Sequence, residues 1–252
     1  MDLGNHTIQS ELRFSEGARS FKNPSLPGDI LICPDPIHNF KSMRNHILDH
    51  GIVFQLEGRS VSLGLEDFQL VKDRQALLGE PTPCHKLRER HLNCEGHSRQ
   101  NVLLVFQLLS RSVSNCLRIL GEEDKGTIVG MINDFMDLCN SRRPFHWNPL
   151  ECGFGLHLEE QQKCLERFRQ LVETMRVNPP KPKPGKVYKR IQKERKRHTM
   201  PPFQKGLLCD IDAITSLTND LMRSGQKYVL LSKVSLIDKK QQIDNNESIF
   251  FS

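Results

Sequence analysis

The sequence predicts a mainly helical α+β fold, with short strands near both ends of the chain and a larger helical body between them. Apolar residues recur at helical spacing in four long segments, residues 99–120, 127–139, 156–177 and 207–222. Short apolar runs at residues 29–33 and 228–232 have the composition of strands. A chain of 252 residues can bury a substantial core, in one large domain or two small ones.

Composition narrows the class of protein. No apolar run approaches the roughly 20 residues needed to cross a bilayer, so we expect no membrane insertion. The first residues are neither basic nor apolar, which is not the pattern of a secretory signal. The eight cysteines are scattered without close pairs, which indicates reduced thiols rather than a disulfide framework. We therefore expect a cytosolic or nuclear protein.

The most informative stretch is residues 29–45. Asp35 follows the apolar run, and Pro36 suits the first turn of a helix. His38, Lys41 and Arg44 then recur at helical spacing. This pattern predicts an acid, an imidazole and two cations gathered beyond a strand end, where open α/β sheets hold their ligands. The alternative is that Asp35 only caps the helix and that the basic residues form a solvated face.

The segments around this stretch are less regular. Residues 1–28 lack a sustained period and contain several Gly and Pro, which predicts a loosely ordered lead-in. Apolar positions between residues 46 and 78 predict a turn followed by a helix, which the Gly and Pro of residues 79–83 end.

Four residues of zinc-binding types come next: Cys84, His91, Cys94 and His97. A Cys-x-x-Cys pair is lacking, and a helix would turn Cys84 away from His97. Ordinary helix surface is therefore the favoured interpretation, with zinc as the alternative.

The helical body follows. Residues 99–120 are apolar around most of the early helix, as in a helix buried inside a domain, and Gly121 closes it. Residues 127–139, 156–177 and 207–222 each carry an apolar stripe, so we expect these helices to pack on one another.

A basic stretch separates the last two helices. Residues 181–198 hold a quarter of the chain's 36 Lys and Arg. Two basic clusters with a spacer predict a nuclear import signal or a phosphate-binding segment. The Pro-rich start equally suits a solvated linker. The candidate nucleic-acid contacts are Lys189, Arg190, Lys193, Arg195, Lys196 and Arg197.

The block Asp35-Pro36-x-His38-x-x-Lys41-x-x-Arg44-Asn45 resembles the one around the second catalytic aspartate of P-element-type DNA transposases, including relatives with a THAP zinc domain. Later blocks resemble the same family in the same order. They are Lys86-Leu87 with His91-Leu92, residues 107–113, 133–142, 203–206 and 228–230, and Asp244-x-x-Glu247 with Phe250-Phe251.

The resemblance implies a helical GTP-binding insertion domain, with a partial RNase H-like sheet built from both chain ends. The resemblance also implies how the chain is divided. Residues 1–28 would be a disordered lead-in, and residues 29–45 would be an RNase H-like piece with the second catalytic Asp. The insertion would span residues 46–225, including a basic linker at 178–202, and residues 226–252 would return to the RNase H-like piece.

By the same resemblance, Asp35 and Glu247 are two of three catalytic carboxylates that hold a Mg²⁺ pair for phosphoryl transfer. Residues 1–28 contain no counterpart of the first catalytic aspartate's strand or of the THAP module. Two carboxylates are too few for a well-held metal pair, so we expect no DNA cleavage or strand transfer by this chain alone.

GTP binding is implied by other residues. Lys86 would meet phosphate, Val102 would pack on the nucleotide, and Asp137 and Asp244 would face the guanine or its metal. Asn101 stands where the family has a lysine, which should weaken binding by removing a charge-assisted bond. Surface polarity or core packing is the alternative role for each residue, and no P-loop signature is present.

The sequence thus favours a fragment or domesticated remnant of a P-element-like transposase, nuclear, binding GTP and DNA, and forming a homo-oligomer if it behaves as transposases do. One alternative is a nuclear adaptor that binds DNA or RNA through the basic linker without nucleotide. The other is an active metal-dependent transposase or nuclease.

Overall fold

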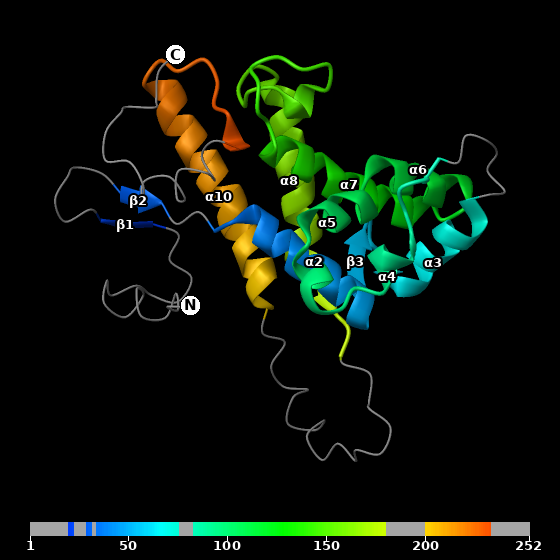
Figure 1. Ribbon diagram of the computed structural model, residues 1–252. Coiled ribbons are helices and arrows are strands. Elements are labelled where there is room, and N and C mark those ends of the chain that lie inside the picture. The colour runs from blue at the N-terminus through cyan, green and yellow to red at the C-terminus, as the bar shows by residue number, and fades with distance from the viewer. Residues whose placement is uncertain (1–19, 23–28, 32–33, 76–82, 180–199, 233–252) are drawn as a thin grey trace, which may run out of the picture.

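The computed structural model describes residues 20–22, 29–31, 34–75, 83–179 and 200–232, and it is mainly helical (Figure 1). A three-stranded antiparallel sheet in the order β4-β3-β5 lies at one end of the helical body. The expected mainly helical α+β fold is confirmed.

Helix α2, Pro36–His50, begins and ends as its sequence dictates. The Asp35 carboxylate accepts a hydrogen bond from the Ile37 amide at 3.0 Å, which caps the first turn, and Pro36 follows directly. Gly51 ends the helix at a φ of 77°, where a side chain would be strained, and its N–H donates to the His46 and Ile47 carbonyls. The capping role of Asp35 is therefore confirmed.

A β-hairpin follows, where a turn and a helix were predicted over residues 46–78. Strands β3, Ile52–Leu56, and β4, Arg59–Leu63, pair antiparallel. Glu57 and Gly58 both have positive φ, as a two-residue turn between twisted strands requires. Helix α3, Leu65–Arg74, comes only after the hairpin. That prediction was wrong because β-branched Ile52 and Val53 before the Glu-Gly turn outweigh the helical period.

The predicted helix over residues 99–120 is two helices. After α4, Glu89–Leu92, and the 3-10 turn η2, Gly96–Gln100, come α5, Val102–Leu108, and α6, Arg111–Ile119. Ser110 breaks the segment because its hydroxyl caps the amide of Val113. Residues 102–119 are long and apolar enough for a membrane span by composition, yet they form these two helices, whose inner side chains lie in the core.

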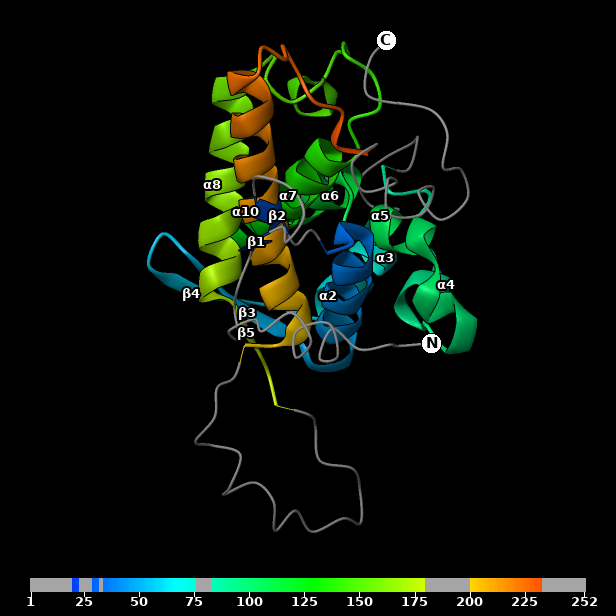
Figure 2. The ribbon, with the colours of Figure 1, turned by 90° about the vertical axis from the view of Figure 1, so that its left-hand side faces the viewer.

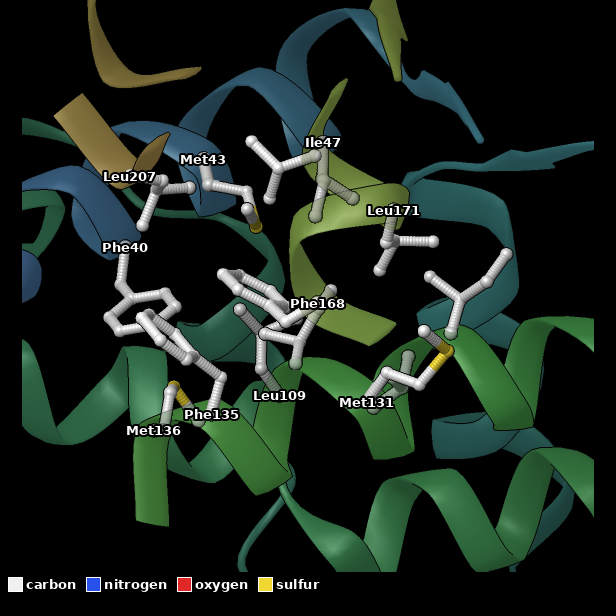
Figure 3. Close-up of a cluster of buried hydrophobic side chains, with 14 of the residues drawn as sticks. Phe40, Met43, Ile47, Leu109, Met131, Phe135, Met136, Phe168, Leu171 and Leu207 are labelled. Atoms are coloured by element: carbon white, nitrogen blue, oxygen red, sulfur yellow. The ribbon is translucent and has the colours of Figure 1, made fainter. Parts of the chain in front are cut away.

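The core lies where α2 meets α7, Glu123–Cys139, and α8, Leu158–Thr174. Phe135 and Phe168 stack with ring centroids 4.1 Å apart, and Phe40 of α2 lies 5.8 Å from Phe135 (Figure 3). All three rings are almost fully buried. They join α2 to two helices that come much later in the chain.

Helix α10, Pro202–Arg223, runs beside α8 and crosses α2 (Figures 1 and 2). The predicted helix over residues 156–177 stops earlier, because β5, Arg176–Val177, leaves it to pair with β3. After α10 the predicted strand at 228–232 makes one bridge, in which Val229 pairs with Phe154.

The predicted strand at 29–33 is present as β2, Asp29–Leu31, paired antiparallel with β1, Ser20–Lys22. The lead-in predicted at 1–28 therefore contains a strand. Three residues are too few to show a period, so the sequence pattern did not indicate it.

Candidate functional site

Two acids lie near each other where the N-terminal end of α2 meets α10: Asp35 at the start of α2 and Asp210 on α10. Asn39 of α2 donates a hydrogen bond at 2.9 Å to Asp210 of α10. Asp210 is fully buried, and its second oxygen, Oδ1, has no hydrogen-bond partner among the residues that the structure describes. Burial raises the pKa of Asp210 to about 8; the bond from Asn39 opposes this shift and the charge of nearby Asp35 adds to it. Asp210 is thus a protonated acid at neutral pH, beside the exposed carboxylate of Asp35.

Two features of α10 bring Asp210 close to the start of α2. Gly206 lets α10 approach α2, since a Cβ there would meet the Asn39 side chain at 2.5 Å. Asp210 itself lies on the apolar stripe of α10, in phase with Leu207 and Ile214. We did not predict Asp210, although an acid on an apolar stripe is a signal that could have found it.

We predicted that Arg44 would join the group at the start of α2, and this prediction was wrong. Its side chain is fully buried at the other end of the helix, where it donates to Cys94 Sγ at 3.2 Å and to the Arg99 carbonyl at 2.6 Å. Burial lowers its pKa, and the nearby Asp49 charge partly offsets this. Helical spacing alone did not separate Arg44 from His38, which is exposed near Asp35.

Three of the nucleotide candidates surround α4 and α5. Lys86 is exposed in the turn before α4. Asn101 is exposed and caps α5, accepting a hydrogen bond from the Leu103 amide at 2.9 Å. Val102 is half-buried as the first residue of that helix. Because α4 packs on α5, one cation and one helix N-terminus lie on neighbouring segments.

Asp137 lies elsewhere, in a polar cluster on α7. Its carboxylate accepts hydrogen bonds from Asn133 at 2.8 Å and from Asn148 at 3.3 Å. Burial raises its pKa to about 6; the charges of Glu151 and Asp134 add to the shift, and the bond from Asn133 opposes it. Within the described ranges, no hydrogen bond or ion pair joins Asp137 to Lys86 or Asn101.

The same cluster holds an ion pair. Arg111, at the start of α6, pairs with Asp134, and its backbone amide donates to Asn133 Oδ1 at 3.0 Å. Burial raises the pKa of Asp134, while the charge of Arg111 lowers it. This α7 cluster (Arg111, Asn133, Asp134, Asp137, Asn148 and Glu151) therefore combines half-buried acids with one cation.

The remaining predicted site residues fall outside the described residues. They are Glu247, Asp244, Lys189, Arg190, Lys193, Arg195, Lys196 and Arg197. The meeting of Asp35 with Glu247 therefore stays a prediction.

The zinc-type residues have separate structural partners. Cys84 Sγ lies 2.7 Å from Cys116 Sγ, and the burial of this pair raises the pKa of Cys84. His91 is buried, with Nε2 2.8 Å from the Gln107 side-chain oxygen. Cys94 faces Arg44, as described above. In the described part of the chain, no three His, Cys, Asp or Glu side chains gather in a metal-binding group.

Known proteins resemble this chain. Residues 37–151 match the family of TNP-like, GTP-binding insertion domains. The transposable element P transposase of Drosophila melanogaster is 24% identical over 247 residues, which is 93% of this chain and 30% of that protein. In a Drosophila P element transposase strand transfer complex, one chain superposes with a TM-score of 0.75 at 21% identity, over 95% of this chain and 52% of the other.

The structural match shows a shared fold, and the chain spans less than a third of the length of its curated relative. Both matches cover nearly all of this chain, whereas the domain match covers α2 to η3. The chain thus resembles P-element-type DNA transposases over nearly its whole length, and residues 37–151 carry the match to the GTP-binding insertion domain of TNP-like proteins.

Proposed function

We propose that this chain is a fragment or domesticated remnant of a P-element-like transposase that binds GTP and nucleic acid and does not cleave DNA alone. The match of residues 37–151 to a GTP-binding insertion domain carries the proposal. The exposed Lys86 supports it, because a cation favours phosphate.

In this proposal Lys86 contacts the phosphates and Val102 packs on the nucleotide. Asn101 should make GTP binding weaker, since it caps α5 at a position where a cation would attract the phosphates. Asp137 and Asp244 contact the guanine or its metal. A half-buried carboxylate suits guanine, which presents two adjacent N–H donors that adenine does not.

Calorimetric titration of the chain with GTP and with ATP tests this function. We expect saturable heat with GTP, weaker binding of ATP, and at least roughly tenfold weaker GTP binding in Lys86→Ala, the loss expected for one charge-assisted bond. Lys163→Ala is the matched control, because Lys163 is exposed on α8 and its ion pair there, among the residues that the structure describes, is with Glu159 of the same helix. If GTP gave no heat at millimolar concentration, GTP binding would be rejected, and the hypothesis of a nuclear adaptor without nucleotide would be favoured.

DNA is the proposed macromolecular partner, because the structural relative is a transposase in a strand transfer complex. Lys189, Arg190, Lys193, Arg195, Lys196 and Arg197 would contact its phosphates. Replacing Lys193, Arg195, Lys196 and Arg197 with Ala should weaken DNA binding and flatten its salt dependence. If DNA binding were unchanged in this variant, these basic residues would not be the DNA contacts. A nuclear location and self-association belong to the same proposal.

Mg²⁺ has weaker support. Of the predicted ligands, Asp35 uses one oxygen to cap α2, and its described acidic neighbour, Asp210, is buried and protonated. Carboxylates must be ionised to hold Mg²⁺ well. Magnesium-dependent plasmid cleavage that disappears in both Asp35→Ala and Glu247→Ala would establish the active transposase instead.

A further inference from the structure

The loop between α7 and η3, Pro149–Glu151, exposes two aromatic rings. Phe145 is 76% exposed and Trp147 is 86% exposed, more than any other large apolar residue that the structure describes. Arg142 and Arg143 are exposed in the same loop. In Figure 1 this green loop projects at the top of the molecule, next to the start of α8. Residues 142–148 are called the aromatic loop below.

The aromatic loop is fixed at its base. The Gly153 amide donates to the Pro144 carbonyl at 3.0 Å, and the His146 amide donates to Cys152 Sγ at 3.2 Å. The Asn148 side chain accepts from the Leu150 amide at 3.1 Å and donates to Asp137. These bonds hold the backbone on both sides of Trp147, so the rings are presented to solvent at little further cost in chain entropy.

The charges around the rings select an anionic partner. Arg142 donates through Nε to the Asn140 side chain at 3.1 Å, and Arg143 is exposed beside it. His146 lies against Trp147 with ring centroids 5.3 Å apart, and Glu151 lies 3.6 Å from His146. Glu151 and Asp137 are only partly exposed, at the base of the loop. Exposed aromatic rings beside exposed arginines are the pairing with which proteins hold unpaired bases and their phosphates.

We propose that the aromatic loop is a stacking platform for single-stranded nucleic acid. Phe145 and Trp147 stack on unpaired bases, while Arg142 and Arg143 contact the adjoining phosphates. A duplex buries the faces of its bases, so it offers the rings nothing except at its ends. The platform does not include the nucleotide candidates around α5, Lys86, Asn101 and Val102.

The chain carries its own reporter, because Trp147 is its single tryptophan. Titrating the chain with a short oligothymidylate should quench the tryptophan fluorescence saturably, and a blunt hairpin duplex of equal charge should quench it far less. Stacking is worth about 1–3 kcal/mol per base, so Phe145→Ala should weaken binding by roughly five- to 150-fold. Trp147→Phe should retain binding of a labelled strand and Trp147→Ala should lose it, as measured by fluorescence anisotropy.

The arginines need a charge-matched control. Replacing Arg142 and Arg143 with Ala should weaken binding and lower the salt slope by roughly 1.4, at about 0.7 per phosphate contact. Replacing Arg59 and Arg90 with Ala removes the same charge from the hairpin and from α4, and should leave the quenching curve unchanged. All of these variants change exposed side chains, so their melting temperatures should match the parent.

Three results would overturn the platform: no saturable quenching, equal quenching by duplex, or equal losses in the control pair. Quenching by GTP alone would assign the rings to the nucleotide instead. Concentration-dependent self-association that Trp147→Ala abolishes would assign them to a second copy of the chain. GTP calorimetry on Phe145→Ala separates this proposal from the preceding one, because we expect GTP binding there to be unchanged.

Discussion

Burial raises the pKa of two acids in this molecule, Asp210 and Asp137, but to different extents. Asp210, between α2 and α10, is fully buried with one hydrogen bond from a neutral amide, and its pKa is raised to about 8. Asp137, on α7, is half-buried with two amide donors and Arg111 nearby, and its pKa rises only to about 6. The difference shows that burial sets the direction of the shift, while donors and cations limit its size.

The largest effect should come from Asp210→Asn. Asp210 is protonated in the folded state up to about pH 8 but ionised in the unfolded chain above about pH 4, so stability falls as pH rises between these values. Asn is a neutral isostere and removes that fall. At pH 8 we expect a melting midpoint at least roughly 3 °C above the parent, since about 1 kcal/mol moves it 2–4 °C.

Thermal melts from pH 4 to pH 9 check this expectation. The curves of parent and variant should converge near pH 4 and separate as pH rises. A variant that is less stable than the parent at pH 8 would mean that the Asp210 carboxylate is ionised and paired in the folded protein.

Asn39→Ala should come next. It removes the hydrogen bond that Asn39 donates to the Asp210 carboxyl group, the one such bond this group has among the described residues, and leaves a gap beside Gly206. An unsatisfied buried acceptor costs about 1–3 kcal/mol, which chemical denaturation would measure as a lower midpoint with the same slope. In the double variant with Asp210→Asn, the two effects should not add. Strict additivity would mean that the bond does not form.

Asp137→Asn should change stability over a narrower window. Its folded pKa of about 6 means that the parent loses stability between about pH 4 and pH 6, and the variant should not. The gain at pH 7 should therefore be smaller than that of Asp210→Asn. The same substitution should reduce the preference for GTP over ATP, which competition calorimetry would reveal. If Asp137→Asn gained more stability at pH 7 than Asp210→Asn does, the pKa of Asp137 would be raised more than that of Asp210, which would contradict the comparison.

The smallest effect should come from Asp35→Asn. Asn also caps helices, so α2 should keep its stability. The charge of Asp35 contributes to the raised pKa of Asp210, less than burial does, so removing it should lower that pKa. Carboxyl carbon NMR resonances across a pH titration would show the change. An unchanged Asp210 titration would mean that the two carboxyls do not interact.

Sequence patterns predicted the elements whose signals are local. The segments at 127–139 and 207–222 carry unbroken apolar stripes, and the helices α7 and α10 contain them. The cap at Asp35 was equally readable, because Asp before Pro36 is a local start signal. The sequence analysis did not predict the hairpin at 52–63 or the helix break at Ser110, because the apolar periodicity in these segments is stronger than their turn and cap signals.

The candidate site was less predictable, because its geometry depends on contacts between distant segments. Asn39 and Asp210 are 171 residues apart and meet through the crossing of α2 with α10. Arg44 lies on the same helix as His38, yet it turns inward to Cys94 and Arg99. Helical spacing gives the face of one helix, but it does not say which helix covers that face. Family resemblance identified Lys86, Asn101 and Val102 together, which no local pattern would have done.

In the function that we propose, the phosphates of GTP bind beside Asn101, at the start of α5. Calorimetry on Asn101→Lys is the decisive measurement, with Asn115→Lys as the control, because both asparagines are exposed and both changes add one positive charge. We expect Asn101→Lys to bind GTP roughly tenfold more tightly than the parent, the gain for about 1.4 kcal/mol, and Asn115→Lys to bind as the parent does. Equal affinity in all three proteins, or no binding in any of them, would contradict this proposal.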